Sequence, residues 1–207
     1  MAEMENNKER IPLAHYTALY QAGDCAEIAK RTGLPYLPER GAFLVTLMRS
    51  RYEITFPGFA IRFLDGPGDF LSAYPQAQIL LLRFMTAGRL APMTGGYLSY
   101  RDMPWGEVYF ANFNGRCIRR LAHTFCGKGE AVARKMAVLG GRPYDKGDIG
   151  WEFDFMPGLS IRFAIWDPDE EFPPSAQILF SDNFPAAFSA EDMAFVGDIF
   201  IRIMSEV

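Results

Sequence analysis

The sequence predicts an α+β fold: an internally duplicated helix–strand–strand–helix unit in which an antiparallel sheet packs with helices. Three observations predict it, namely a pair of repeated segments, strand-like alternation around Pro-Gly turns, and apolar stripes typical of helices. The chain has 207 residues, of which 49% are hydrophobic and 22% charged, as in ordinary globular proteins. We therefore expect a single domain over residues 1–207, with two repeats packed about a pseudo-twofold axis.

The repeat is clearest in two short segments. Residues 53–63 (EITFPGFAIRF) recur at 152–163 with one inserted methionine, and PQAQIL at 75–80 recurs as PSAQIL at 174–179. Twelve of these seventeen aligned positions are identical, where chance would give about one because each residue type supplies only a few per cent of a chain. A duplicated unit is therefore the simplest interpretation of the pattern.

The first repeat spans about residues 14–90 and begins with a helical pattern over 14–32 that a Gly-Asp pair interrupts. Strands follow where apolar residues are closely spaced or alternate, and Pro57-Gly58 predicts a turn in which glycine takes a positive φ. Pro75 suits the first turn of a helix that ends near Gly88. The expected strands are residues 43–48, 52–56 and 59–63.

A segment over residues 91–114 joins the repeats. It is rich in Gly, Pro, Tyr and Trp, whereas flexible linkers are rich in Gly and Ser and lack large aromatic side chains. We therefore expect it to be ordered, with a strand at 97–101, a tight turn, and a strand at 107–110.

The second repeat spans about residues 115–205. Residues 114–125 are a helix candidate with a basic face formed by arginines. The last helix, expected over 190–204, is the clearest, because Ser189 and Asp192 form a capping box ahead of an apolar stripe.

Charge and hydropathy exclude two classes of partner. The net charge is −4 and the pI is near 5.3, so the basic surface typical of nucleic-acid-binding proteins is not expected. The longest apolar run is residues 79–82, far short of the roughly 20 residues that span a bilayer. With a polar N-terminus and no apolar signal sequence, we expect a cytoplasmic protein without membrane contact.

The cysteines and histidines predict neither a disulfide framework nor a metal site. The cysteines are odd in number and show no C-x-x-C spacing, and two histidines are too few for a His-rich site. We expect no resident metal and interpret the thiols as small buried apolar groups. These residues are Cys25, Cys117, Cys126, His15 and His123.

Two further features leave alternatives open. Residues 167–171 carry four carboxylates, and such a loop is either solvated, in contact with a partner or ligand, or bound to a hard cation. Arg62 and Arg162 occupy matched positions in the repeats. Each arginine either forms an ion pair with a carboxylate, facing solvent or between the repeats, or captures an anion in a cleft between the repeats.

The sequence resembles one known family. Residues 92–106 (PMTGGYLSYRDMPWG), 150–157 (GWEFDFMP) and 166–180 (WDPDEEFPPSAQILF) are similar to the uncharacterised family called domain of unknown function 3786, and the resemblance extends from about 14 to 205. The resemblance implies a cytoplasmic protein of anaerobic bacteria and archaea. It implies no particular activity, because none is established for the family. Some relatives look fused to cysteine-rich iron–sulfur segments, which this sequence lacks.

Three functions remain open. The first is an accessory or cofactor-binding protein of anaerobic metabolism that binds a small molecule, for which a tetrapyrrole or corrinoid is a possible ligand because flat rings stack on aromatic side chains. The second is an enzyme that uses a carboxylate of the acidic loop with an arginine anion clamp. The third is a protein-interaction module anchored by Trp105 and Trp166.

We place the ligand site at the junction of the two repeats. Its expected residues come from the aromatic middle segment and from the second repeat. They are Tyr97, Tyr100, Arg101, Trp105, Arg162, Trp166 and Glu170.

Overall fold

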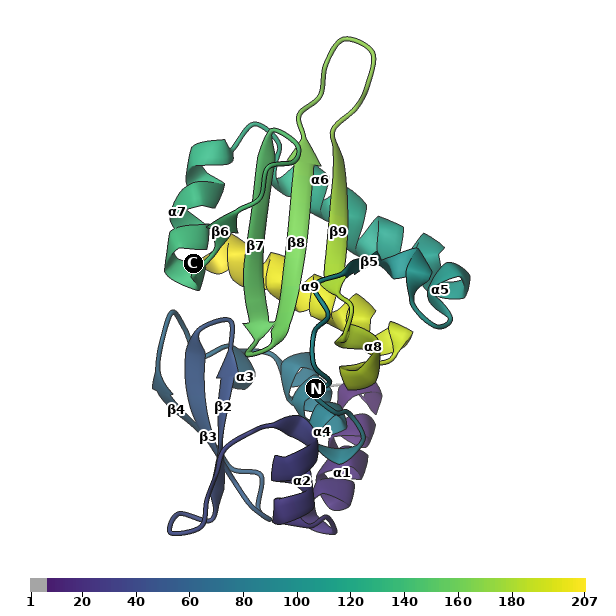
Figure 1. The fold of residues 1–207 in the computed structure, drawn as a ribbon. Helices are drawn as coiled ribbons and strands as arrows, with labels where there is room; N and C mark the ends of the chain where they lie inside the picture. The colour runs from purple at the N-terminus through teal and green to yellow at the C-terminus, as the bar shows by residue number, and fades with distance from the viewer. Residues whose placement is uncertain (1–6) are drawn as a thin grey trace, which may run out of the picture. The chain divides into compact units, whose positions relative to one another are not determined.

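The computed structural model describes residues 7–207, with side chains from Ile11 onward (Figure 1). The chain divides into two compact units. Unit 1 contains the described residues up to Val45 together with Ser50–Arg89, and unit 2 contains Thr46–Arg49 and Leu90–Val207. Each unit holds one antiparallel sheet and several helices, so the predicted α+β class is confirmed.

The sheet of unit 1 has the strand order β1-β2-β3-β4. Its strands are β1 (Tyr36–Leu37), β2 (Ala42–Leu47), β3 (Ser50–Thr55) and β4 (Ile61–Asp65). The helices are α1 (Asn7–Gln21), α2 (Cys25–Thr32), α3 (Phe70–Ala73) and α4 (Pro75–Thr86). The interruption expected near residues 23–24 is confirmed, because the Asp24 side chain accepts the Glu27 N–H at 2.9 Å and caps α2.

The sheet of unit 2 has the order β5-β9-β8-β7-β6. Its strands are β5 (Tyr97–Ser99), β6 (Arg142–Pro143), β7 (Ile149–Met156), β8 (Leu159–Trp166) and β9 (Ser175–Ser181). The helices are η1 (Tyr100–Asp102), α5 (Gly106–Phe113), η2 (Asn114–Ile118), α6 (Arg119–Phe125), α7 (Gly129–Leu139), α8 (Phe184–Ala187) and α9 (Ala190–Glu206). Of these, η1 is a 3₁₀-helix and η2 a π-helix.

The core of unit 2 lies between one face of this sheet and the helices α6 and α9 (Figure 1). Phe200 of α9 packs on Phe153 and Phe163, with ring centroids 5.4 and 6.2 Å apart. Because side chains alternate along a strand, the residues between these aromatics point to the opposite, open face. The capping box of Ser189 and Asp192 at the start of α9 is confirmed.

The middle segment corrects one prediction. Residues 107–110, expected as a strand, belong to helix α5, and the strand expected at 97–101 ends at Ser99. The reason is the tight corner before α5: a Cβ on Gly106 would lie 1.8 Å from the Tyr100 carbonyl oxygen. Only glycine fits there, so the chain turns directly from η1 into a helix.

The Pro57-Gly58 turn also differs from the prediction. In the first hairpin the positive φ falls on Phe59 (55°) and not on Gly58, whereas in the second hairpin Gly158 takes it (82°). The inserted Met156 accounts for the difference. It pairs directly with Leu159 after a register shift, which leaves a two-residue turn.

The second repeated segment adopts two different structures. Residues 75–80 begin helix α4, whereas residues 174–179 run into strand β9. Pro75 occupies the first turn of α4, whereas the residues after Pro174 pair with β8 and β5 on both sides and extend as a central strand. The predicted helix–strand–strand–helix duplication is therefore not confirmed at this element.

The glycine corner makes a stability prediction. Gly106→Ala should lower the free energy of unfolding by about 1–3 kcal/mol, because the added methyl group meets a backbone oxygen that cannot move freely. Gly115→Ala is the matched control, since a Cβ there meets no atom within 4 Å, and it should be neutral or stabilising by up to about 1 kcal/mol. Urea unfolding of both variants measures the difference, and equal stabilities would contradict this account of the corner.

Candidate functional site

Polar side chains gather on the open face of the sheet in unit 2. They occupy alternate positions of neighbouring strands, opposite the aromatic core. We call this group the cross-strand cluster; it consists of Tyr97, Arg142, Glu152, Asp154, Ser160 and Arg162.

Glu152 lies at the centre of the cross-strand cluster. Its carboxylate accepts hydrogen bonds from Arg142 Nη2 at 2.8 Å and from Arg162 Nε at 2.6 Å. The three residues are direct cross-strand partners on β6, β7 and β8. Each bond is charge-assisted, so the glutamate orients both guanidinium groups.

Arg162 also lies between two aromatic rings. Its guanidinium carbon is 3.7 Å from the centroid of Tyr97 and 5.0 Å from that of Tyr144. Both distances fall within the range of cation–π attraction. Two rings and one carboxylate thus hold this side chain in place on the open face.

The environment shifts two pKa values in opposite directions. Burial opposes ionisation of Glu152, but the hydrogen bonds from Arg142 and Arg162 outweigh it and hold its pKa below the ordinary value. Burial raises the pKa of Tyr97, and the nearby Glu152 carboxylate adds to the rise. At neutral pH the glutamate is therefore ionised and the tyrosine is neutral.

Unit 1 carries the same arrangement on its own hairpin. Glu53 accepts from Arg40 at 2.8 Å and from Arg62 at 2.7 Å, and Glu53 pairs with Arg62 across β3 and β4. Of the two predicted roles for Arg62 and Arg162, ion pairing with a carboxylate is observed, and it lies within each hairpin. The glutamates were missed in the sequence, although both stand in the repeated segment.

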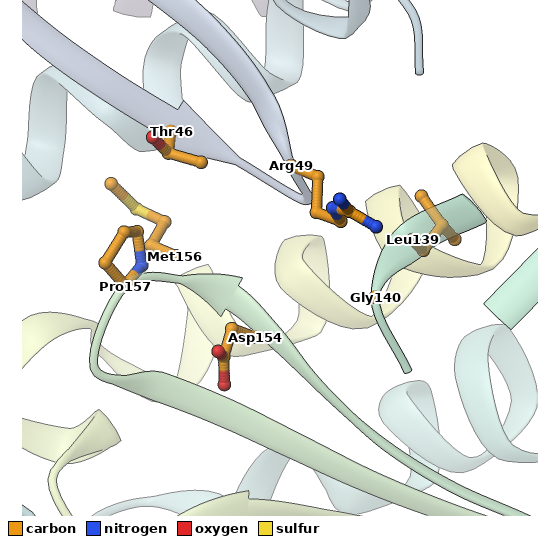
Figure 2. A pocket seen from close by; sticks show the side chains of 7 residues that line it. All are labelled: Thr46, Arg49, Leu139, Gly140, Asp154, Met156 and Pro157. Carbon is orange, nitrogen blue, oxygen red and sulfur yellow. The ribbon is translucent and has the colours of Figure 1, made fainter. Parts of the chain in front are cut away.

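A pocket of about 260 Å³ adjoins the cross-strand cluster, and both share Asp154. Figure 2 shows its lining residues, which come from the end of β2 and the β2–β3 turn, the end of α7, and β7 with its following turn. They are Thr46, Arg49, Leu139, Gly140, Asp154, Met156 and Pro157. Asp154 also accepts hydrogen bonds from Ser160 Oγ at 2.6 Å and from Arg142 at 3.2 Å.

The turn that carries Arg49 is unusual. Met48 and Arg49 both have positive φ, 44° and 67°, in a two-residue hairpin turn where Asn-Gly is the common pair. Met48 is buried and its N–H donates to the Phe155 carbonyl at 2.9 Å. Arg49 donates to the carbonyl of Val138 at 3.3 Å, at the C-terminal end of α7. Bulky residues in this strained conformation concentrate at functional sites.

The structure brings only two of the predicted site residues into direct contact, Tyr97 and Arg162. Tyr100 is 1% exposed, stacks on Phe113 at 4.0 Å and donates to the Ala190 carbonyl at 2.7 Å. It belongs to the core.

The other four predicted residues lie away from the pocket lining. Arg101 lies over the Phe110 ring at 3.8 Å. Trp105 is 76% exposed and, with Val108 and Tyr109, forms an apolar patch at the start of α5. Trp166 ends β8, and Glu170 is exposed in the loop that projects beyond the sheet between β8 and β9 (Figure 1).

The aspartates of the acidic loop bond to backbone N–H groups. Asp167 accepts from Gly127 at 2.6 Å, and Asp169 accepts from Glu171 and Phe172 at 2.8 and 2.7 Å. Among the side chains that the structure describes, from Ile11 to Val207, no group of three or more Cys, His, Asp or Glu is placed to hold a metal ion. Over the same residues, no helix combines the length and apolar character needed to cross a membrane.

The lowered pKa of Glu152 makes stability depend on pH. A carboxyl whose pKa falls on folding stabilises the protein above its unfolded pKa, near 4.3, and this stabilisation is lost as the pH falls through the folded value. Glu152→Gln should lower the free energy of unfolding at pH 7 by about 1–3 kcal/mol. The variant should then lose less of its free energy of unfolding than the wild type does as the pH falls. The control Glu170→Gln, in the exposed loop, should have the same free energy of unfolding as the wild type at each pH.

The measurement is chemical unfolding of the three proteins between pH 7 and pH 3. If Glu152→Gln retained the full acid dependence of the wild type, Glu152 would not be the group that the arginines hold ionised.

Comparisons with known proteins identify the family. A model described as a domain of unknown function (DUF3786) matches residues 24–203, and the chain belongs to this family. Neither the curated proteins nor the solved structures contain a match.

Proposed function

We propose that this member of the DUF3786 family is a binding protein for a small carboxylate-bearing molecule, which enters the pocket and pairs with Arg49. The observation that carries the proposal is the strained turn, which places an arginine at the rim of a pocket with largely apolar walls. Such a pocket with few polar groups is typical of small-molecule sites.

The balance of charge favours an anion. Arg142 and Arg162 are paired with Glu152, and Arg142 also with Asp154. Arg49 is the cationic side chain of the pocket lining, and Asp154, the carboxylate of that lining, already pairs with Arg142. The Arg49 guanidinium, which donates to the Val138 carbonyl, can therefore pair with a ligand that carries a single negative charge.

The size of the pocket restricts the ligand. About 260 Å³ is slightly below the usual range for small-molecule sites. A tetrapyrrole or corrinoid would place only a carboxylate arm there, and its ring would lie outside on the open face. The proposed accessory role in the cytoplasm of anaerobes rests on the family resemblance alone.

Binding is favoured over catalysis by the protonation states. Glu152 has a lowered pKa, whereas a general acid or base works best with a pKa near neutrality. The Ser160 hydroxyl donates to Asp154, and Asp154 also pairs with Arg142, so this carboxylate is occupied by two side chains of the cluster. The histidines, His15 and His123, lie on α1 and α6, outside the pocket lining.

We also infer that the two hairpins derive from one duplicated unit. The support is the shared position of the glutamate and arginine in β3–β4 and in β7–β8, each with a second arginine on the same carboxylate. After a duplication, both copies would keep this ion pair, because the pair sets the register of the two strands.

Binding is tested with the variant Arg49→Gly. Glycine adopts the φ of 67° without strain, so the variant should fold while losing the anion contact. Saturation-transfer NMR with benzoate and its neutral analogue benzamide should show the wild type preferring benzoate by about tenfold or more. Arg49→Gly should abolish that preference.

Arg51→Gln is the matched control. Arg51 lies two residues away and pairs with Asp65 outside the pocket, so this variant should bind benzoate as the wild type does. Equal binding of benzoate by wild type and Arg49→Gly would overturn the site. That result would favour the interaction-module alternative, for which the patch of Trp105, Val108 and Tyr109 is the supporting feature.

A further inference from the structure

We propose that the outer edge of strand β4 in unit 1 is a docking site for an extended segment of a partner protein, which adds a further strand to the sheet. The strand order places β4 at the edge of this sheet, where β3 is its only neighbour among the described strands (Figure 1). An edge strand presents backbone N–H and C=O groups that can pair with another chain. Many peptides are bound in this way, by main-chain hydrogen bonds and by contacts of alternate side chains.

Unit 2 shows what occupies the corresponding edge of a matched hairpin. The hairpins β3–β4 and β7–β8 share one register, in which a glutamate pairs directly with an arginine. On its other side, β8 pairs antiparallel with β9 along residues 161–166. In unit 1 the counterpart of the segment that runs into β9, residues 75–80, begins helix α4 instead. The same hairpin therefore binds a strand in one unit and has an open edge in the other.

The open edge leaves apolar side chains of β4 uncovered. In unit 2, Phe163 pairs with Ile178 of β9 and is 1% exposed. Phe63, at the matched position of β4, is 36% exposed. Ile61 is likewise only partly buried, whereas its counterpart Ile161 is buried. An incoming strand with an apolar residue at the position of Ile178 would cover Phe63 and gain the contact that a cross-strand pair provides.

The backbone of β4 directs hydrogen-bonding groups to the outer edge. The Thr55 N–H donates to the Ala60 carbonyl at 3.0 Å, and this bond fixes the alternation of the antiparallel ladder. Arg62 therefore exchanges its hydrogen bonds with β3, while the N–H and C=O groups of Ile61 and Phe63 face outward. These four backbone groups are placed to pair with an incoming strand.

The charged side chains of β4 do not block this edge. Charges on an edge strand usually discourage pairing with another chain. Here, however, Arg62 bonds to Glu53 at 2.7 Å, and Asp65 pairs with Arg51. Both partners belong to β3, so the two charged groups are directed toward the neighbouring strand and away from the outer edge.

Strand β9 defines the chemistry of the partner. Its residues Ala176, Ile178 and Phe180 are the cross-strand partners of apolar residues of β8. The residues between them and at the ends of the strand are serine, glutamine and leucine. We therefore expect the partner to be an extended protein segment in which apolar residues alternate with mostly polar ones.

The probe is a synthetic peptide with the sequence of residues 173–182 (PPSAQILFSD), added to the full chain and followed by hydrogen exchange detected by NMR. Without peptide, the amides of Ile61 and Phe63 should exchange quickly and that of Arg62 slowly. With peptide at about 1 mM, Ile61 and Phe63 should exchange about tenfold or more slowly, because their N–H groups become paired. The amide of Arg62 should change little, since it already bonds to β3.

A control peptide carries Ile178→Pro and Leu179→Pro. Consecutive N–H groups of a strand point to opposite edges, so one of the two lost donors would always have faced β4. This peptide should leave the exchange of Ile61 and Phe63 unchanged. The comparison of the two peptides needs no variant of the protein, so it stands even if a substitution in β4 disturbs folding.

Phe63→Ser tests the apolar contact and keeps the backbone donors. The variant should bind the first peptide about tenfold more weakly, because the covered ring is lost, and circular dichroism checks that it is folded. Val108→Ser is the matched control, since it removes an exposed apolar side chain from unit 2. Its affinity for the peptide should differ from that of the wild type by less than about twofold.

Several results would overturn the proposal. They are unchanged exchange of Ile61 and Phe63 at about 1 mM peptide, equal binding of the double-proline peptide, and weaker binding by Val108→Ser without an effect of Phe63→Ser. Slower exchange of the two amides at higher protein concentration, without any peptide, would also contradict it. In that case β4 would pair with a second copy of this chain and not with a partner segment.

Discussion

The ion-pair row of Arg142, Glu152 and Arg162 is the interaction on which the architecture of unit 2 depends. The three residues are direct partners on adjacent strands, and a shift of one residue in either strand would turn its buried aromatic side chains (Phe153 and Phe155 in β7, Phe163 in β8) out of the core. The contact between Glu152 and Arg162 requires a particular distance and particular atoms, so it fixes the register of β7 and β8. Apolar packing alone tolerates exchanges of one hydrophobic side chain for another. The same row also holds Arg162 against Tyr97 on the open face.

This separation of faces explains how one sheet supports a core and a candidate site. Phe153 and Phe163 face α9, while Glu152 and Asp154 face outward. Asp154 lines the pocket and pairs with Arg142, so it connects the ion-pair row to the pocket. The pocket has one arginine on a strained turn beside apolar walls, which suits a ligand with a single negative charge and an apolar body.

The sequence predicted the α+β class, the helix caps and the pairing of the repeated hairpins, because these depend on local signals such as Ser189 with Asp192. It could not predict that PSAQIL becomes a strand, since pairing with β8 and β5 outweighs the local resemblance to a helix start. Nor did it identify Arg49, because a positive φ at an arginine carries no sequence signature. The sequence analysis singled out Tyr97 and Arg162, which are in contact, because aromatic and arginine residues are conspicuous, and it did not consider Glu152 beside them.

The most direct test of the central claim is a double-mutant cycle on Glu152→Gln and Arg162→Gln, measured by chemical unfolding at pH 7. If the pair organises the open face, the two substitutions should be coupled by about 1 kcal/mol or more. Additive effects within about 0.5 kcal/mol would mean that the carboxylate and the guanidinium act independently. In that case the register of β7 and β8 would rest on the aromatic core alone, and the account of the ion-pair row would be wrong.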